Sequence, residues 1–343
     1  MKLIKTEDAV GQVICHDMTQ IIKGVTKDAV FRKGHIITEE DIPVLLSIGK
    51  DHVYVWENDE SMMHENEAAE VLCEACKGSN MSRSEVKEGK IELTAECDGI
   101  LKIDREKLRV INSFGQMMIA SRHGDFPVKK GDKIAGTRII PLLIEREKME
   151  EVKWLCGEEA IMNVIPYSDR KVGIVTTGNE VFYGRIEDTF TPVVKDKLAE
   201  FGCTVCGHET VNDENENIEK AVRKLLSEGA DMIVCTGGMS VDPDDKTPLA
   251  IRNVCGSVVT YGAPVLPGAM FLLAYYGDKN IPIMGLPGCV MYAKRTIFDI
   301  VLPRIAAGEI LTAEDFAKLG EGGLCLNCEI CTYPNCGFGK GGY

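Results

Sequence analysis

The sequence lacks a long apolar segment, although apolar residues make up 45% of its 343 positions. No apolar run approaches the roughly 20 residues that a helix needs to cross a bilayer. The N-terminal sequence Met1–Asp8 has no apolar core of the kind that marks a secretory signal peptide. We therefore expect a cytoplasmic protein without a membrane partner. The apolar content supports the cores of roughly two or three domains.

Positive charge is also scarce. Lysine and arginine number 39 against 53 aspartate and glutamate residues, which gives a net charge of -14. A surface of this sign repels nucleic acids and anionic membranes, so we exclude both as main partners. An anionic ligand must then be held by local groups, against the field of the whole protein.

Cysteine, in contrast, is plentiful, with 14 residues. Thiols in the cytoplasm stay reduced, so a disulfide framework is not expected. Most of these cysteines, such as Cys235 within an apolar run, fit the role of small buried hydrophobes.

Four cysteines differ from the others because they fall within twelve residues, separated by two, two and four residues: Cys325, Cys328, Cys331 and Cys336. Thiolates this close repel one another unless a cation binds them. The spacing predicts a metal site that holds Zn²⁺ or an iron–sulfur cluster. The alternative is a tail of free, redox-labile thiols. The preceding glycine-rich sequence, Gly320–Gly323, predicts a flexible tether.

The pattern of apolar, polar and turn-forming residues changes along the chain. We expect a small mixed α/β module at 1–56, a linker and β-rich domain at 57–165, an α/β domain at 170–308 and a Cys-rich tail at 309–343. Within the first module the pattern predicts a helix at 38–48 and a strand at 52–56. Residues 145–169 read as a helix that becomes a connector.

Residues 170–308 alternate between strand and helix patterns. The predicted strands are 171–176, 203–211, 232–236, 257–260 and 281–286, and the predicted helices are 192–201, 214–227 and 290–307. This alternation predicts a three-layer α/β fold, with a mostly parallel sheet covered by helices on both faces. In such sheets ligands bind beyond the carboxyl ends of the strands.

The loop after the strand 232–236 is the most informative one. Adjacent Gly237 and Gly238 let the backbone approach a ligand closely and turn its N–H groups toward an anion. Three carboxylates follow, on Asp242, Asp244 and Asp245. A phosphate cradle beside clustered carboxylates requires a cation between them, so the loop predicts a phosphorylated ligand bound with Mg²⁺. The loops 176–180 and 285–289, and Asn212-Asp213, should lie at the same edge.

These landmarks resemble, in order and spacing, the molybdopterin-binding domain shared by molybdopterin adenylyltransferases and molybdopterin molybdotransferases. The resemblance rests on 177–180, Asp213, 236–245 and 286–288. It implies that the glycine loops hold the phosphate or pyrophosphate of the pterin and that the acidic residues bind Mg²⁺. The implied ligand contacts are Thr177, Gly178, Thr236, Gly237, Gly238, Ser240, Lys246, Pro287 and Gly288. The implied catalytic residues are Glu180, Asp213 and Asp245, and the implied Mg²⁺ ligands are Glu180, Asp213, Asp242 and Asp245.

The flanking sequences 10–17, 33–55 and 265–268 resemble the molybdotransferase branch. This resemblance implies the insertion of molybdate into adenylylated molybdopterin with release of AMP. Lys246, Lys294 and Arg295 would add positive charge at the leaving phosphate. The expected partners are molybdopterin or its adenylylated form, other copies of this chain, and molybdoenzymes or proteins of the cofactor pathway.

Some positions depart from the molybdotransferase pattern. Ala269 or Met270 stands where the family carries a lysine, and Cys289 replaces an asparagine. Residues 309–343 do not resemble the usual C-terminal β-domain. Two alternatives therefore stay open, a molybdopterin adenylyltransferase and a non-catalytic cofactor carrier or sensor whose tail reports metal or redox state.

Overall fold

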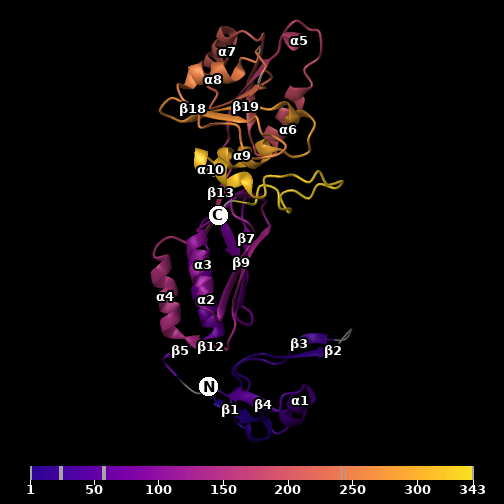
Figure 1. The fold of residues 1–343 in the computed structure, drawn as a ribbon. Helices are drawn as coiled ribbons and strands as arrows, with labels where there is room; N and C mark the ends of the chain where they lie inside the picture. Colours follow the sequence, from indigo (N-terminus) through magenta and orange to yellow (C-terminus); the bar gives the residue numbers. More distant parts are fainter. Residues whose placement is uncertain (1, 23–25, 56–58, 241, 244, 342–343) are drawn as a thin grey trace. The chain divides into compact units, whose positions relative to one another are not determined.

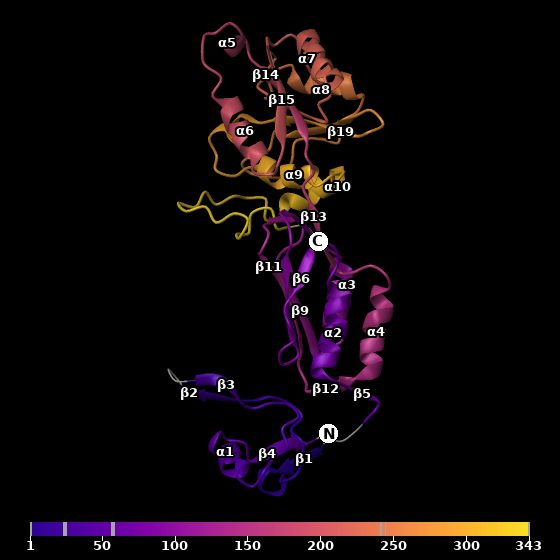
Figure 2. The same cartoon turned by 180° about the vertical axis from the view of Figure 1, so that it is seen from behind.

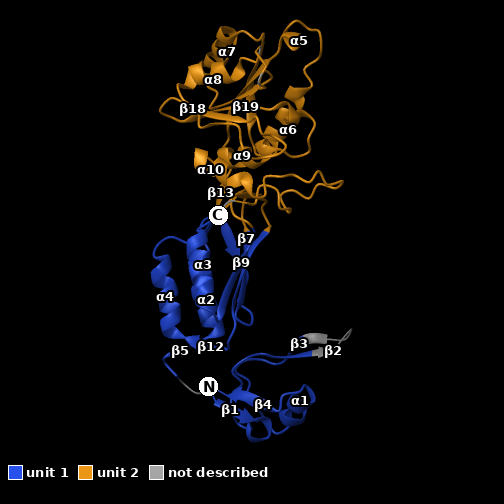
Figure 3. Cartoon of the chain, viewed as in Figure 1, with its two compact units in different colours: residues 1–94, 103–122, 133–163 blue, residues 95–102, 123–132, 164–343 orange. Residues whose placement is uncertain are grey.

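The computed structural model describes residues 2–22, 26–55, 59–240, 242, 243 and 245–341. These residues form two compact units (Figure 3). Unit 1 consists of 1–94, 103–122 and 133–163, and unit 2 of 95–102, 123–132 and 164–343. The predicted domain 57–165 thus contributes residues to both units. None of the described helices is both long and apolar enough to span a membrane.

Unit 1 begins with a small mixed module. Its elements are β1 (Lys2–Lys5), η1 (Thr6–Asp8), β2 (Met18–Ile22), β3 (Thr26–Phe31), α1 (Asp41–Ser47) and β4 (His52–Val55). Strands β1 and β4 pair antiparallel, as do β2 and β3. Ile14, Met18, Ile37, Leu45 and Val53 belong to its buried core. Trp56, the expected end of the strand 52–56, lies outside the described residues.

The rest of unit 1 combines helices with antiparallel strands. The elements are β5 (Met62–His64), α2 (Glu65–Cys76), β6 (Met81–Arg83), β7 (Lys90–Ala95), α3 (Arg105–Ser113), β9 (Met117–Ser121), β11 (Lys133–Ile139), β12 (Leu143–Glu145) and α4 (Arg146–Cys156). Four of the strands form a sheet in the order β6-β7-β11-β9. In β7, Ile91 and Leu93 are buried while Lys90 and Glu92 are exposed, the period-two pattern of a strand covered on one face.

Unit 2 contains a six-stranded sheet in the order β15-β14-β16-β19-β18-β17. Its strands are β14 (Lys171–Thr177), β15 (Thr204–Val211), β16 (Met232–Thr236), β17 (Thr260–Tyr261), β18 (Leu272–Tyr276) and β19 (Ile281–Leu286). The first four in spatial order run parallel. Strand β18 runs in the opposite direction, antiparallel to both β19 and β17, so β17 has the direction of the parallel strands. The predicted fold class, α/β with a mostly parallel sheet, is confirmed.

Helices cover both faces of this sheet (Figures 1 and 2). They are α5 (Asn179–Phe182), α6 (Phe190–Ala199), α7 (Asn215–Ser227), α8 (Thr247–Cys255) and α9 (Ile297–Ala306). Met232 and Val234 of β16 pack in one core with α6 and α9, whereas Ile233 and Cys235 pack in another with α7 and α8. Because β16 is buried on both faces, its sequence is a continuous apolar run.

Three predictions along this region are corrected. The segment 290–307 is not one helix but a 3₁₀ turn, η2 (Gly288–Met291), followed by α9, which begins after Thr296. The strand at 257–260 is displaced to β17, and β18 is an additional strand. Residues 162–166, expected in a connector, form β13 (Met162–Pro166).

The tail is packed within unit 2, so the predicted flexible tether is wrong. After α10 (Ala313–Ala317) and η3 (Lys318–Gly320), Leu324 pairs with Leu266 and Phe338 is buried. The glycines permit close packing: a Cβ on Gly323 would lie 2.2 Å from the carbonyl oxygen of Pro264. These glycines therefore serve tight backbone contacts rather than mobility.

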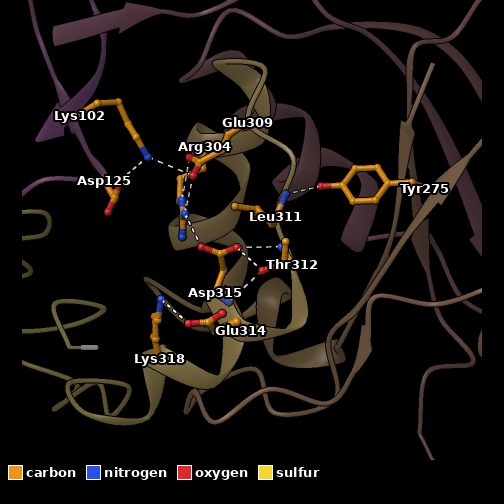
Figure 4. Close-up of polar contacts among 10 residues, drawn as sticks. All are labelled: Lys102, Asp125, Tyr275, Arg304, Glu309, Leu311, Thr312, Glu314, Asp315 and Lys318. Carbon is orange, nitrogen blue, oxygen red and sulfur yellow. Dashed lines mark hydrogen bonds and ion pairs between the residues drawn. The ribbon is translucent and has the colours of Figure 1, made fainter. Parts of the chain in front are cut away.

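A second, three-stranded sheet has the order β10-β8-β13, where β8 is Gly99–Ile103 and β10 is Phe126–Val128. A network of charged groups joins this sheet to the C-terminal end of α9 (Figure 4). The buried Arg304 guanidinium donates to Glu309 at 2.6 and 2.9 Å and to Asp315 at 3.1 Å. Glu309 also accepts from Lys102 at 3.0 Å, and Lys102 pairs with Asp125. Burial opposes the charge of Arg304, but the carboxylate of Glu309 outweighs it and raises the arginine pKa.

Candidate functional site

The carboxyl ends of three parallel strands, β14, β16 and β19, meet at one edge of the large sheet. Thr176 of β14 aligns with Thr236 of β16, and Thr236 aligns with Leu286 of β19. The loops that follow these strands therefore begin side by side, as the strand alternation predicts.

Gly237 and Gly238 occupy positions that other residues would fill badly. Both have positive φ, +83° and +56°, and a Cβ on Gly237 would lie 2.0 Å from the carbonyl oxygen of Thr177. A Cβ on Gly238 would lie 2.8 Å from the Thr247 hydroxyl and 3.1 Å from the Thr177 hydroxyl. The two glycines thus let the loop after β16 contact the end of β14 directly.

Thr177 and Thr247 hold these loops together with their side chains. Their hydroxyl oxygens lie 3.0 Å apart, and the Thr247 hydroxyl donates to the Gly237 carbonyl at 2.9 Å. Both threonines are buried. Lys246 occupies the N-cap of α8, and Thr247, the first residue of the helix, links the two loops.

Asp213 lies next to Gly238, and Glu180 lies next to Gly178. The Asn179 N–H donates to Asp213 Oδ2 at 2.8 Å, and Asp213 Oδ1 is 3.7 Å from the position of a Cβ on Gly238. The Glu180 carboxylate folds over Gly178, with Oε1 2.8 Å from the position of a Cβ there. Three loops and two of the predicted carboxylates therefore meet in this region.

The acidic turn 242–245 folds on itself. The Asp245 N–H donates to the Asp242 carbonyl at 3.0 Å, and the Lys246 ammonium donates to the Pro243 carbonyl. Asp242 is exposed and Asp245 half-buried, while Asp244 lies outside the described residues. The Tyr261 hydroxyl donates to the Met239 carbonyl at 3.1 Å and lies 3.4 Å from the Ser240 carbonyl. Burial and, to a lesser degree, the charge of Asp245 raise the pKa of Tyr261.

Among the residues that the structure describes, no three His, Cys, Asp or Glu side chains converge closely enough to hold a metal ion. This holds for Glu180, Asp213, Asp242 and Asp245, and equally for the four tail cysteines. Like charges at this edge repel in the absence of a cation, and the acidic turn satisfies its groups locally. The magnesium site therefore stays a prediction.

Pro287 and Gly288 follow β19 at the same edge. Gly288 starts η2 and has no atom within 4 Å of the position of a Cβ, so the space beside it is open. Gly237 and Gly238 are enclosed by protein, whereas Gly288 faces room for a ligand.

A polar cluster that sequence reasoning missed lies under this edge. The Thr176 hydroxyl is within 2.9 Å of His208 Nε2, 3.0 Å of the Thr191 hydroxyl and 3.1 Å of Asp188 Oδ2. Asp188 Oδ1 also accepts the N–H groups of Phe190 and Thr191, at the start of α6. No glycine or motif marks these positions; the only signal is a polar Thr176 at the end of a buried strand.

The two titratable groups of this polar cluster have shifted pKa values. Burial raises the pKa of Asp188, but hydrogen bonds from Thr191, Phe190 and Thr176 outweigh it and leave the pKa below the usual 3.8. Burial lowers the pKa of His208 below 6.5, and the charge of Asp188 offsets only part of this shift. At neutral pH the cluster thus combines a neutral imidazole with a carboxylate.

Lys294 and Arg295 both donate hydrogen bonds to groups of the protein itself. The Lys294 ammonium donates to the carbonyl oxygens of Cys328 and Glu329 at 3.3 and 2.6 Å. The Arg295 guanidinium donates to Glu200 and Asp299 at 2.9 and 2.8 Å. Both precede α9 rather than lie in its first turns, so their expected place in that helix is wrong. Their role at a leaving phosphate stays a prediction.

Two family models match parts of the chain. Residues 3–57 match a family described as a domain of unknown function (DUF8806). Residues 173–307 match the family described as "Probable molybdopterin binding domain".

Two curated relatives are CinA-like proteins of Mycobacterium. The protein of Mycobacterium sp. (strain MCS) is 37% identical over 86 residues, 25% of this chain and 20% of the relative. That of Mycobacterium avium (strain 104) is 36% identical over 101 residues, 29% of this chain and 23% of the relative. The chain therefore spans about a fifth of the length of these relatives.

Solved structures similar to part of the chain include the molybdopterin biosynthesis enzyme MoaB of Thermus thermophilus. It is 26% identical, with a TM-score of 0.35, and the match covers 41% of this chain and 98% of MoaB. A structure of MogA is 21% identical, with a TM-score of 0.33, over 40% of this chain and 93% of MogA. On the family match, the α/β part of unit 2 contains a molybdopterin-binding domain.

Proposed function

We propose that unit 2 binds molybdopterin or its adenylylated form at the edge formed by the ends of β14, β16 and β19. The observation that carries this proposal is the meeting of Gly237 and Gly238 with Thr177, Thr247 and Asp213 in a region that matches the molybdopterin-binding family. An acidic protein must grip a phosphate with backbone N–H groups, which the glycine loops supply. The open space beside Gly288 provides room for the bound group.

The reaction that we propose is the transfer of molybdate into adenylylated molybdopterin, with release of AMP. Sequence resemblance outside 173–307 favours this branch. The carboxylates of Glu180 and Asp213 lie beside the glycine loops, where the phosphoanhydride of the ligand would sit. Their role would be to orient the ligand and any attacking oxygen.

The sequence predicts Mg²⁺ on Glu180, Asp213, Asp242 and Asp245. The described members of this set do not converge on one point, so these side chains alone do not form an ion site. The dependence of AMP release on added Mg²⁺ tests whether the ion binds once the pterin ligand is present and completes its coordination.

A non-catalytic carrier is the second candidate, and one observation favours it. The cations expected to assist the reaction, Lys246, Lys294 and Arg295, all donate to groups of the protein itself. A carrier needs the phosphate grip but no cations at the scissile bond.

One set of incubations distinguishes the candidates. The full-length chain is mixed with adenylylated molybdopterin, molybdate and Mg²⁺, and AMP is followed over time. Molybdate-dependent AMP release supports the molybdotransferase. Pyrophosphate release from ATP and molybdopterin would instead show an adenylyltransferase. Tight binding without either product would show a carrier, and absence of binding would contradict the whole proposal.

Asp213→Asn tests the site within this assay. We expect a loss of ligand affinity or AMP release of at least about tenfold, because the neutral amide no longer provides the charge-assisted bond to the Asn179 N–H. Asp278→Asn is the matched control, since Asp278 is an exposed aspartate in the turn between β18 and β19. Equal behaviour of the two variants would remove Asp213 from the site.

A further inference from the structure

The four cysteines of the tail line a single cavity of unit 2. Its volume is about 540 Å³, and Cys325, Cys328, Cys331 and Cys336 all contribute to its wall. Leu324, Leu326, Tyr333 and Phe338 supply apolar surface to the same wall. None of these thiols is in a disulfide. The sequence spacing and the fold therefore select the same four thiols.

The thiols surround a volume rather than a point. A single Zn²⁺ draws four sulfurs to about 2.3 Å from one centre, and hence to roughly 4 Å from each other. In the described part of the chain no three metal-binding side chains approach in this way. A four-iron, four-sulfide cluster takes each thiolate at a different iron, so its ligands stand further apart around the inorganic core.

Two of the four cysteines are held by packing against the core of unit 2, and the other two lie on an exposed loop. Cys325 and Cys336 are partly buried against the core of unit 2, and the Cys325 N–H donates to the Leu266 carbonyl at 2.8 Å. The Tyr333 hydroxyl anchors the second side by donating to the Asp299 carbonyl at 2.9 Å. Cys328 and Cys331 lie between these anchors and are exposed. Their loop can close on a bound group without displacing packed side chains.

Two cations line the cavity in a protein whose net charge is -14. Lys294 donates to two carbonyl oxygens of the cysteine loop, and the Arg295 guanidinium lies 5.2 Å from the centre of the Tyr333 ring. A cluster bound by four thiolates is anionic, and positive charge beside it lowers the free energy of its bound form.

We propose that Cys325, Cys328, Cys331 and Cys336 bind one iron–sulfur cluster in this cavity. Each thiol releases its proton when it binds iron. Ferrous iron, ferric iron and inorganic sulfide supply the core, so its assembly needs no oxidant. The site does not require the proposed reaction of the pterin site.

The test uses the full-length chain, purified without oxygen and reconstituted with ferrous iron, ferric iron and sulfide. We expect iron and acid-labile sulfide in equal amounts, with visible charge-transfer absorption. Cys328→Ser and Cys331→Ser should each reduce bound iron and sulfide by at least about fivefold. Because both side chains are exposed, these changes remove no core packing. Cys206→Ser is the matched control, an exposed cysteine on β15 outside the cavity, and should keep the full amount.

Three outcomes would overturn the proposal. One is zinc bound in a one-to-one ratio with no sulfide after anaerobic purification. Another is the absence of any bound metal after reconstitution. The third is full retention of iron and sulfide in both cavity variants while circular dichroism shows native folding.

Discussion

At the scale of single residues, the glycines at the edge formed by the ends of β14, β16 and β19, the ligand edge, have two different physical roles. Gly237 is enclosed by the carbonyl of Thr177, whereas Gly288 faces open space. The sequence presents both as glycines at strand ends and does not distinguish them. Because their surroundings differ, substitution by alanine should change the stability of the protein at Gly237 but not at Gly288.

Gly237→Ala should lower the free energy of unfolding by about 1–3 kcal/mol and disrupt ligand binding. The new methyl group would lie 2.0 Å from a carbonyl oxygen, in a backbone conformation with φ of +83°. Chemical denaturation measures the stability. Gly184→Ala is the control, because Gly184 also has positive φ, +67°, but no neighbour within 4 Å. Equal effects would mean that φ alone, and not the contact with Thr177, decides the outcome.

Gly288→Ala should leave stability within about 0.5 kcal/mol of wild type but weaken molybdopterin binding at least about tenfold. The methyl group enters space that we assign to the ligand, without contacting the protein. Ligand titration measures the effect. Gly136→Ala, at another open glycine, should change neither quantity. Unchanged affinity in Gly288→Ala would place the ligand elsewhere.

His208 makes the stability depend on pH. Because burial lowers its pKa below 6.5 in the folded state, the unfolded state binds the proton more tightly. The contribution of neutral His208 is therefore present above pH 6.5 and is lost as the pH falls below it. The melting temperature of His208→Gln should change less than that of wild type between about pH 7.5 and about pH 5.5. Asp188, with a pKa below 3.8, stays ionised throughout. An identical pH dependence of the two proteins would contradict this account.

The residues near the ligand edge could be anticipated to different degrees. Gly237, Asp213 and Gly288 follow strands with clear apolar patterns, so their common edge follows from topology. The link from Thr247 to Thr177 joins positions 70 residues apart and leaves no periodic signal. Asp188 and His208 were missed for the same reason, since their interaction exists only after α6 and β15 pack on β14.

At the scale of elements, α9 shows how a local cap decides where a helix begins. Thr296 and Asp299 form a capping box, in which the Thr296 hydroxyl accepts a helix N–H and Asp299 accepts the Thr296 N–H at 2.7 Å. The apolar pattern from 290 onward does not show this boundary. A prediction from periodicity alone therefore starts the helix too early and includes η2. The buried N-cap Thr296 instead makes the helix begin at Ile297.

Thr296→Ala should lower the free energy of unfolding by about 1–2 kcal/mol, because it removes the cap of a buried helix. Thr312→Ala removes the corresponding hydroxyl from the capping box of α10, whose cap is more exposed, and should cost nearer to about 0.5 kcal/mol. Urea denaturation of both variants checks the order. A larger loss in Thr312→Ala would show that burial of the cap is not what sets the cost.

At the scale of the whole chain, the tail completes the core of unit 2. Phe338 is only 4% exposed, and the rings of Tyr333 and Phe126 lie 6.0 Å apart. We expect Phe338→Ala to destabilise unit 2 by about 3–5 kcal/mol, as for other buried phenylalanines. Calorimetry should show a lower melting temperature for unit 2. Leu326→Ala is the control, because Leu326 is 78% exposed and should have little effect. A wild-type melting temperature in Phe338→Ala would mean that the tail is not part of this core.

Because unit 2 is assembled from distant segments of the chain, it can finish folding only late in translation. Phe126 and Tyr333 are 207 positions apart, yet their side chains pack together. At a translation rate of about 5–20 residues per second, the first ring waits roughly 10–40 s for the second to be made. During this interval the surface of β10 that receives the tail stays uncovered on the ribosome-bound chain. Slow translation downstream of β10 should therefore increase its exposure to chaperones and proteases, whereas unit 1, built entirely from residues up to 163, can finish folding before most of unit 2 is made.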